Sequence, residues 1–268
     1  MGSGAFTAYR HIVAAQVRSQ AQYRASFAVD VVGSVLFGVL DIASVLVLFR
    51  VAPALGGFAL ADVFLMAALA GTAFALADLA VGNVERLRVY VRSGLLDAVL
   101  VRPLGVLTQL TVSDVAPRRV GRVLFGVAVL AVAAAHARIA PTPLSLTVLV
   151  MTPIAGAVIF AGIFVATAAV AFWWIDSGEI ANGLTYGGLN FTQYPITIYG
   201  ALFRRLFAYA IGFAFVAYYP ALALLGRRDP LGGPALLGYA APVAAAVIGA
   251  GAALIWRRGV RHYRSSGS

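Results

Sequence analysis

Six long apolar stretches follow one another along the chain, and each can form a helix that crosses a lipid bilayer. About 20 mostly apolar residues are needed to span the hydrocarbon core. The segments between the stretches carry turn residues, such as Pro53 with Gly56 and Gly57, which interrupt helices. The pattern therefore predicts an all-α membrane protein with six transmembrane helices. The stretches are Ser26–Phe49, Phe58–Val81, Gly121–Ala137, Leu144–Trp174, Leu206–Leu225 and Ala235–Trp256.

The first 25 residues mix basic and amide side chains with scattered large apolar ones. They contain no compact apolar core that leads to a small-residue cleavage site, so a cleaved signal peptide is not expected. We predict that residues 1–25 form an amphipathic interfacial helix on the cytoplasmic side. The transmembrane domain is expected at 26–256, with a cytoplasmic coupling segment at 83–120, and a cytoplasmic tail at 257–268.

Composition agrees with this class. Hydrophobic residues make up 62% of the 268 and charged residues only 11%, whereas soluble domains carry roughly 25% charged residues. The net charge is +10, but the arginines lie beside apolar stretches, which indicates membrane orientation and no nucleic-acid partner. Sixteen arginines, including Arg204 and Arg205, fall on the predicted side of both termini, and four fall on the other side. Both termini are therefore expected in the cytoplasm.

The residue types that the chain lacks exclude several kinds of chemistry. All twenty basic residues are arginine, so a Walker A loop, which needs a lysine at the phosphates, is impossible. No cysteine is present for a thiolate metal site or nucleophile. The three histidines are scattered, and we expect neither an enzyme nor a cofactor in this chain. Any ATP and Mg²⁺ would be bound by a separate ATPase chain.

The segment Asn83–Pro117, between the second and third stretches, contains a recognisable pattern. It predicts a short basic helix, a break at Gly94, a second short helix and a stop at Pro103. Leu95, Val99 and Leu100 form an apolar edge at helical spacing in the second helix. Such an element suits docking into a groove of another protein, and an ordinary interfacial loop is the alternative.

The run Arg92–Asp97 followed by Leu100–Leu104 resembles the coupling-helix region of ABC-2-type permeases. The segments Gln193–Tyr199, Tyr218–Gly226 and Arg261–Ser268 strengthen the resemblance to a bacterial branch of that family. The resemblance implies an exporter subunit in the bacterial cytoplasmic membrane. It would pair with a second permease, identical or homologous, and dock on a cytoplasmic ABC ATPase dimer. It also implies re-entrant elements between the last two spans, for which Gly226–Pro234 is a candidate. The residues implied at the ATPase contact are Arg92, Gly94, Leu95, Asp97, Leu100, Arg102 and Pro103.

Acidic residues inside the apolar stretches are hypotheses for function, since intramembrane charges are costly. Asp30 and Asp41 share one face of the first helix at a spacing of eleven residues. They either line a pathway or subunit interface, or pair with interfacial arginines, as Asp78 can with Arg86 or Arg119. Asp62 lies near the other end of the second stretch.

Aromatic residues of the fifth stretch, among them Phe213 and Tyr218, either contact an apolar cargo or face lipid. The polar connection at 176–199 is rich in glycine and is expected on the cytoplasmic side. It would form a second ATPase contact, a cargo gate or a mobile loop.

The sequence thus favours the permease subunit of an exporter for a hydrophobic or amphipathic cargo in contact with membrane lipid. Two other classes stay open. An ion-coupled secondary transporter would need broken helices and paired charges at mid-depth. A membrane assembly protein would need only packing surfaces.

Overall fold

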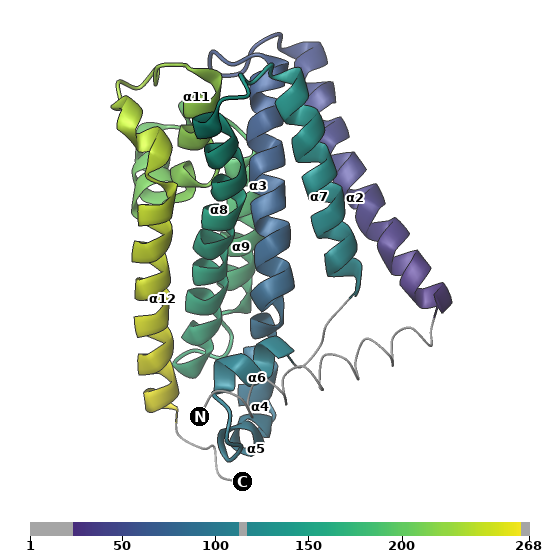
Figure 1. The fold of residues 1–268 in the computed structure, drawn as a ribbon. Coiled ribbons are helices and arrows are strands. Elements are labelled where there is room, and N and C mark those ends of the chain that lie inside the picture. The colour runs from purple at the N-terminus through teal and green to yellow at the C-terminus, as the bar shows by residue number, and fades with distance from the viewer. Residues whose placement is uncertain (1–23, 113–116, 264–268) are drawn as a thin grey trace.

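The computed structural model describes residues 24–112 and 117–263, and all regular elements among them are helical (Figure 1). The expected amphipathic helix at 1–25 falls almost entirely outside these residues, as does the end of the tail. The long helices are α2 (Arg24–Val51), α3 (Leu60–Val81), α7 (Pro117–His136), α8 (Pro143–Ala169), α9 (Gly178–Thr192) and α12 (Ala241–His262). The short helices are η1 (Gly82–Arg86), α4 (Leu87–Arg92), α5 (Leu95–Leu100), α6 (Val106–Val112), η2 (Val170–Phe172), η3 (Ile196–Ile198), α10 (Ala201–Phe203), η4 (Arg204–Ala210), η5 (Phe213–Phe215), α11 (Tyr218–Leu225) and η6 (Ala235–Tyr239).

The long helices run side by side as a bundle, which confirms the expected all-α fold for the described residues (Figure 1). We call the end of the bundle with the connection between α2 and α3 the upper end and the end with α4 and α5 the lower end, as drawn in Figure 1. Four helical segments of the described chain are long and apolar enough to cross a membrane. Helix α2 covers the first expected span. The four segments are Leu60–Arg92, Arg118–His136, Pro143–Phe172 and Ala241–His262.

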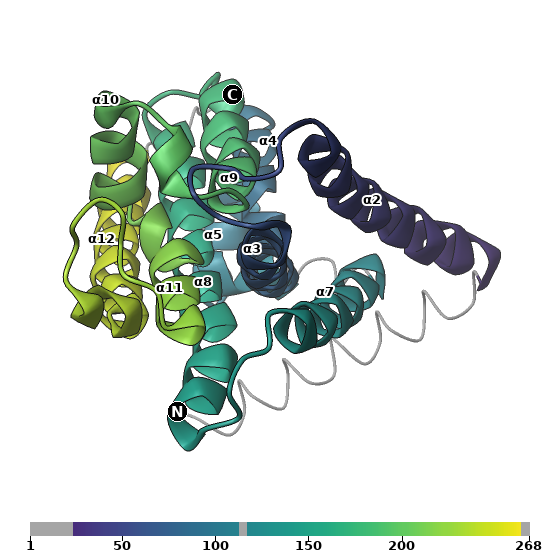
Figure 2. The same cartoon turned by 90° about the horizontal axis from the view of Figure 1, so that it is seen from above.

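Helices α3 and α8 pack together, and small residues let neighbouring backbones come close. A Cβ added at Gly156 of α8 would lie 2.8 Å from the Cβ of Ala73 on α3. A Cβ added at Gly162 would lie 3.0 Å from Ile248 of α12. In a bilayer, where helix association depends on close packing, such contacts favour glycine. Seen from above, α2 and α7 stand to one side of the group formed by α3, α8, α9 and α12 (Figure 2).

The expectation that Leu206–Leu225 forms the fifth span as one continuous helix is wrong. Two helical segments, Ala201–Ala210 and Phe213–Leu225, meet at an angle of 68°. Gly212 lies at the break with a φ of 87°, in the left-handed region that side-chain-bearing residues rarely adopt. Hydropathy alone cannot report this bend, because both segments are apolar.

The bent pair begins and ends at the upper end of the bundle. Just before it, Thr197 Oγ1 donates a hydrogen bond to the Gly56 carbonyl at 2.9 Å, and just after it Arg227 Nη2 donates to the Gly57 carbonyl at 2.8 Å. At the bend, the Phe213 ring packs 5.8 Å from the ring of Phe160, near the middle of α8. Both ends of the pair therefore lie at the same end of the bundle, as in a re-entrant loop, and we call the pair the re-entrant loop. The expected re-entrant element, Gly226–Pro234, only follows this loop.

Residues 176–199 do not form the loop that the sequence suggested, because α9 runs along the bundle between its two ends. At the lower end Asp176 pairs with Arg92, and at the upper end Thr197 bonds to Gly56. The helix satisfies its own hydroxyl groups: Thr185 Oγ1, for example, donates to the Ala181 carbonyl at 2.9 Å. This internal bonding lets Thr185 be buried against the rest of the bundle, and a hydropathy reading does not report it.

Candidate functional site

The lower end of the bundle carries two short helices, α4 and α5, joined through Gly94 (Figure 1). We call residues 87–103, which hold the two helices, their linking residues and the turn after α5, the Gly94 hairpin. Gly94 has a φ of 70°, so the chain turns there through the left-handed region. Helix α5 ends at Leu100, shortly before Pro103. The helix–glycine–helix pattern read from the sequence is confirmed.

One face of the Gly94 hairpin is buried against the rest of the protein. Leu87 of α4 and Leu96 of α5 are 0% and 1% exposed. They belong to a cluster that includes Ala169 at the lower end of α8, Phe172 of η2 and Trp256 of α12. Gln109 of α6 secures the end of α5, since its Nε2 donates to the Val99 carbonyl at 2.9 Å. The hairpin is therefore attached to two long helices through apolar packing.

The other face of the hairpin exposes large apolar side chains. Leu95 is 54% exposed, Leu100 41% and Val101 85%. Arg102 and Pro103 continue the exposed surface. Val99 was expected on the same edge, but it is 7% exposed and packs inward with Leu96, so that part of the prediction is wrong. Residues three apart on a helix share a face, which places Leu96 and Val99 together.

Two arginine side chains of α4 contact residues at the lower end of α9. Arg92 Nη2 pairs with Asp176, although both side chains are well exposed. Gly178 lies so close to Arg88 that an added Cβ would meet the guanidinium. On the other side of the hairpin, burial and then the Asp97 carboxylate raise the pKa of Tyr263, which follows α12. The hairpin thus touches α8, α9 and α12 together.

A buried charge cluster joins α3 to α7 above the hairpin. Asp78 Oδ1 lies 3.1 Å from Arg119 Nε, and its Oδ2 lies 2.8 Å from Arg122 Nη1. Arg119 also donates to Asn83 Oδ1 at 2.8 Å. Gly82 is needed beside the cluster, because a Cβ there would come 2.2 Å from Asp78 Oδ1. Of the two partners that the sequence suggested for Asp78, the structure selects Arg119, and it adds Arg122.

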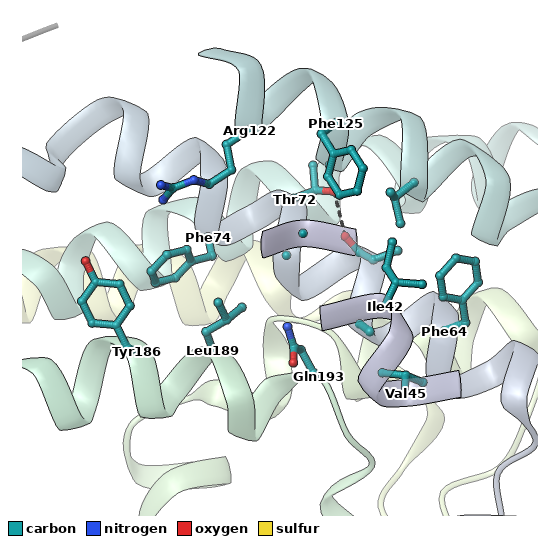
Figure 3. Close-up of a pocket in the computed structure, with 16 residues that line it drawn as sticks. Ile42, Val45, Phe64, Thr72, Phe74, Arg122, Phe125, Tyr186, Leu189 and Gln193 are labelled. Atoms are coloured by element: carbon teal, nitrogen blue, oxygen red, sulfur yellow. Dashed lines mark hydrogen bonds between the residues drawn. The ribbon is translucent and has the colours of Figure 1, made fainter. Parts of the chain in front are cut away.

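A cavity of about 340 Å³ lies between α2, α3, α7 and α9 (Figure 3). Most of its wall is apolar, with Phe64, Phe74 and Phe125 as the largest side chains. Arg122 and Tyr186 lie at one end of the view, and Val45 and Phe64 lie at the other. The remaining lining residues are Gly38, Ile42, Ala67, Ala68, Gly71, Thr72, Gly126, Val129, Leu189 and Gln193.

Comparison with known protein families identifies the family of this chain. The model of one protein family, described as ABC-2 family transporter protein, matches residues 35–267. The chain belongs to this family. Neither the comparison with curated proteins nor the comparison with solved structures gives a match. The suspected ABC-2-type permease is therefore confirmed at the level of the family, and the chain is a component of membrane transport.

The structure of this ABC-2 family protein buries two of the suggested pathway residues. Phe213 and Tyr218 are 1% and 2% exposed, so neither faces lipid. Tyr218 OH donates to Asp229 Oδ1 at 2.6 Å, which closes the end of the re-entrant loop. The side chains of Asp30 and Asp41 lie outside the described part of the structure, and their suggested role stays a prediction.

Asp62 has a structural partner at the upper end. It pairs with Arg227, whose guanidinium also lies 4.6 Å above the centre of the Phe58 ring. This contact fastens the end of the re-entrant loop to the start of α3. Among the described residues, no group of three or more acidic or histidine side chains forms a metal site.

Sequence reasoning missed the cavity and the part of α9 in its wall. Their signal in the sequence is a set of glycines on separate helices, Gly38, Gly71 and Gly126. Glycine is disfavoured inside a helix by about 1 kcal/mol. Two of these glycines have a packing reason in the structure, because a Cβ added at Gly38 would lie 2.4 Å from Phe125 and one added at Gly126 would lie 3.2 Å from Thr72. The sequence does not show which of these helices face one another.

Proposed function

We propose that this chain is the transmembrane subunit of an ABC exporter, driven by a separate ATPase that docks on the Gly94 hairpin. The observation that carries the proposal is the two-sided character of the hairpin. Its inner face is packed against α8 and α12, while Leu95, Leu100 and Val101 are exposed at its outer face. Exposed apolar anchors beside an arginine are typical of a protein interface.

In this proposal the chain crosses the bacterial cytoplasmic membrane six times, through α2, α3, α7, α8, the segment 176–199 that contains α9, and α12. The number of crossings agrees with the sequence prediction, but α9 replaces Leu206–Leu225 as the fifth. Arg204 and Arg205 then move to the other side, so the arginine ratio of sixteen to four becomes fourteen to six. This bias still favours a cytoplasmic lower end and cytoplasmic termini.

The contacts of the hairpin suggest how ATP hydrolysis would be coupled to transport. ATP and Mg²⁺ would be bound by a dimer of the partner ATPase. A displacement of the docked hairpin would act on α9 through the Arg92–Asp176 pair and the contact of Arg88 with Gly178. Helix α9 lines the cavity with Tyr186, so the same displacement would reshape that cavity.

A second permease chain, identical or homologous, would complete the transport path, as the family resemblance implies. The cargo would be hydrophobic or amphipathic, since the cavity wall is mostly apolar. The ion-coupled alternative expects charge pairs at mid-depth. The described cluster around Asp78 lies close to the lower end of α3, where a structural link between helices is the simpler role.

Co-purification from the native membrane, with glutamate variants of the hairpin and a matched control, tests the proposal. Arg102→Glu and Leu100→Glu should release an ABC-type ATPase, because loss of an interface anchor costs about 2 kcal/mol, roughly a 30-fold change in affinity. Arg258→Glu is the control, since Arg258 is also exposed near the lower end but belongs to α12. It should keep the ATPase bound. If no ATPase accompanies the native chain, or if both hairpin variants retain it, the proposal is wrong.

A further inference from the structure

The cavity between α2, α3, α7 and α9 combines a long apolar wall with one cationic end. We propose that it binds a single-chain anionic amphiphile, with its acidic head at Arg122 and its chain along α3. That this ligand also represents the cargo class rests on the proposed function; the binding site itself does not.

The shape of the cavity favours one chain. Its volume of about 340 Å³ is at the small end of the roughly 300–1,000 Å³ of ligand pockets. The lining residues of α3 run from Phe64 to Phe74, and ten residues of helix rise about 15 Å. A narrow apolar space parallel to the helices fits one acyl chain.

The charge at the lower end favours an acidic head. Arg122 lines the cavity and uses Nη1 to bond Asp78, while its side chain is 36% exposed. A guanidinium has five N–H donors, and no further hydrogen bond of Arg122 occurs among the described residues. The excess charge is positive even when Glu85, which interacts with Asp78, Arg119 and Arg88, is counted as ionised. The network then holds three guanidinium groups, of Arg88, Arg119 and Arg122, and two carboxylates, and Arg122 is the arginine that lines the cavity.

The orientation matches that of a lipid in the leaflet at the lower end. Arg122 is near the start of α7, which begins at Pro117, and the cavity extends from there toward the upper end. An amphiphile from that leaflet already has its head at this level and its chain parallel to α3. It can therefore enter without turning over. Gln193 adds one amide to the wall between the two ends.

Gly71 provides a way to fill the cavity without disturbing the packing. It lines the cavity, and a Cβ added there would meet no atom within 4 Å. Gly251 of α12 is the matched control, because a Cβ there also meets nothing and the residue is exposed outside the cavity. Both changes put leucine in place of a helical glycine, so they differ in where the side chain points.

The test is a fluorescence titration of the purified full chain in phosphatidylcholine nanodiscs, without ATP or ATPase. The probes are cis-parinaric acid and its methyl ester, which differ only in the charge of the head. Native protein should bind the acid about tenfold more tightly than the ester, as expected for one hydrogen bond to a charged group. Gly71→Leu should lose the acid, and Gly251→Leu should bind it like the native protein.

Two further variants locate the head. Arg122→Gln should bind acid and ester equally, whereas Gln193→Leu should keep the preference for the acid. Competition by palmitate and by lysophosphatidic acid then tells whether a free fatty acid or a lipid headgroup is preferred. Equal binding of both probes by native protein, or undiminished binding by Gly71→Leu, overturns the inference. Neither result depends on whether an ATPase co-purifies, so this proposal and the proposed function fail separately.

Discussion

The Thr197 hydroxyl donates a hydrogen bond to the Gly56 carbonyl at 2.9 Å, and this contact places the end of α9 beside the turn between α2 and α3. The residues before α9 lie at the other end of the bundle, where Asp176 pairs with Arg92. A segment of polar character therefore connects the two ends. The re-entrant loop that follows stays within the upper part.

The proposed crossing by α9 predicts opposite labelling of two positions. The natural chain has no cysteine, so single cysteines can be introduced without a background. Ile175→Cys, before α9, and Ile198→Cys, after it, are both partly exposed positions. An impermeant thiol reagent added outside intact cells should label Ile198→Cys only. If both cysteines label from the same side, residues 176–199 form a connection on one side, as hydropathy alone suggested.

The buried charge cluster predicts unequal costs for two aspartate changes. Asp78→Asn should lower the melting temperature strongly, because it removes the carboxylate between Arg119 and Arg122. Breaking a buried pair costs about 3 kcal/mol or more. Asp176→Asn is the control, since its pair with Arg92 is well exposed. An exposed pair is worth roughly 1 kcal/mol or less. Thermal unfolding in detergent that ranks the two variants equally would contradict a stabilising role for the cluster.

The contact between Arg227 and Asp62 predicts that the re-entrant loop depends on one arginine. Arg227 bonds Asp62 and the Gly57 carbonyl, whereas no such contact of its neighbour Arg228 occurs among the described residues. Arg227→Gln should speed hydrogen exchange across Phe213–Leu225 by about tenfold, the expected effect of losing a charged hydrogen bond. Arg228→Gln should leave the exchange unchanged. Identical exchange in both variants would show that the loop is held by its apolar packing alone.

Much of the fold follows from the sequence because hydropathy reports long apolar helices directly. The Gly94 hairpin was also predictable, since glycine and proline mark the ends of short helices independently of their surroundings. Val99 was placed on the wrong face because helical spacing does not say which face is buried. In the structure α6 and the ends of α8 and α12 decide that.

The course of α9 and the cavity were not predictable for a different reason. Helix α9 bonds its own hydroxyls, and Gly188 makes room for the Phe213 ring, so its polar and glycine residues are compatible with burial. The contact of Gly188 with Phe213 joins two separate segments of the chain, and the sequence does not show that they meet. The pairing of Asp78 with Arg122 likewise joins residues from two helices, and only the Arg119 partner was among the predicted alternatives.

In the proposed function, an ATPase drives this permease through the Gly94 hairpin. Site-specific cross-linking in native membranes tests it most directly, with Leu100→Cys in the hairpin and Ile198→Cys at the upper end as the control. Both side chains are about equally exposed, at 41% and 42%. The account predicts a cross-link between Leu100→Cys and an ABC-type ATPase, and none from Ile198→Cys. Absence of that cross-link while ATP-dependent transport continues would contradict it.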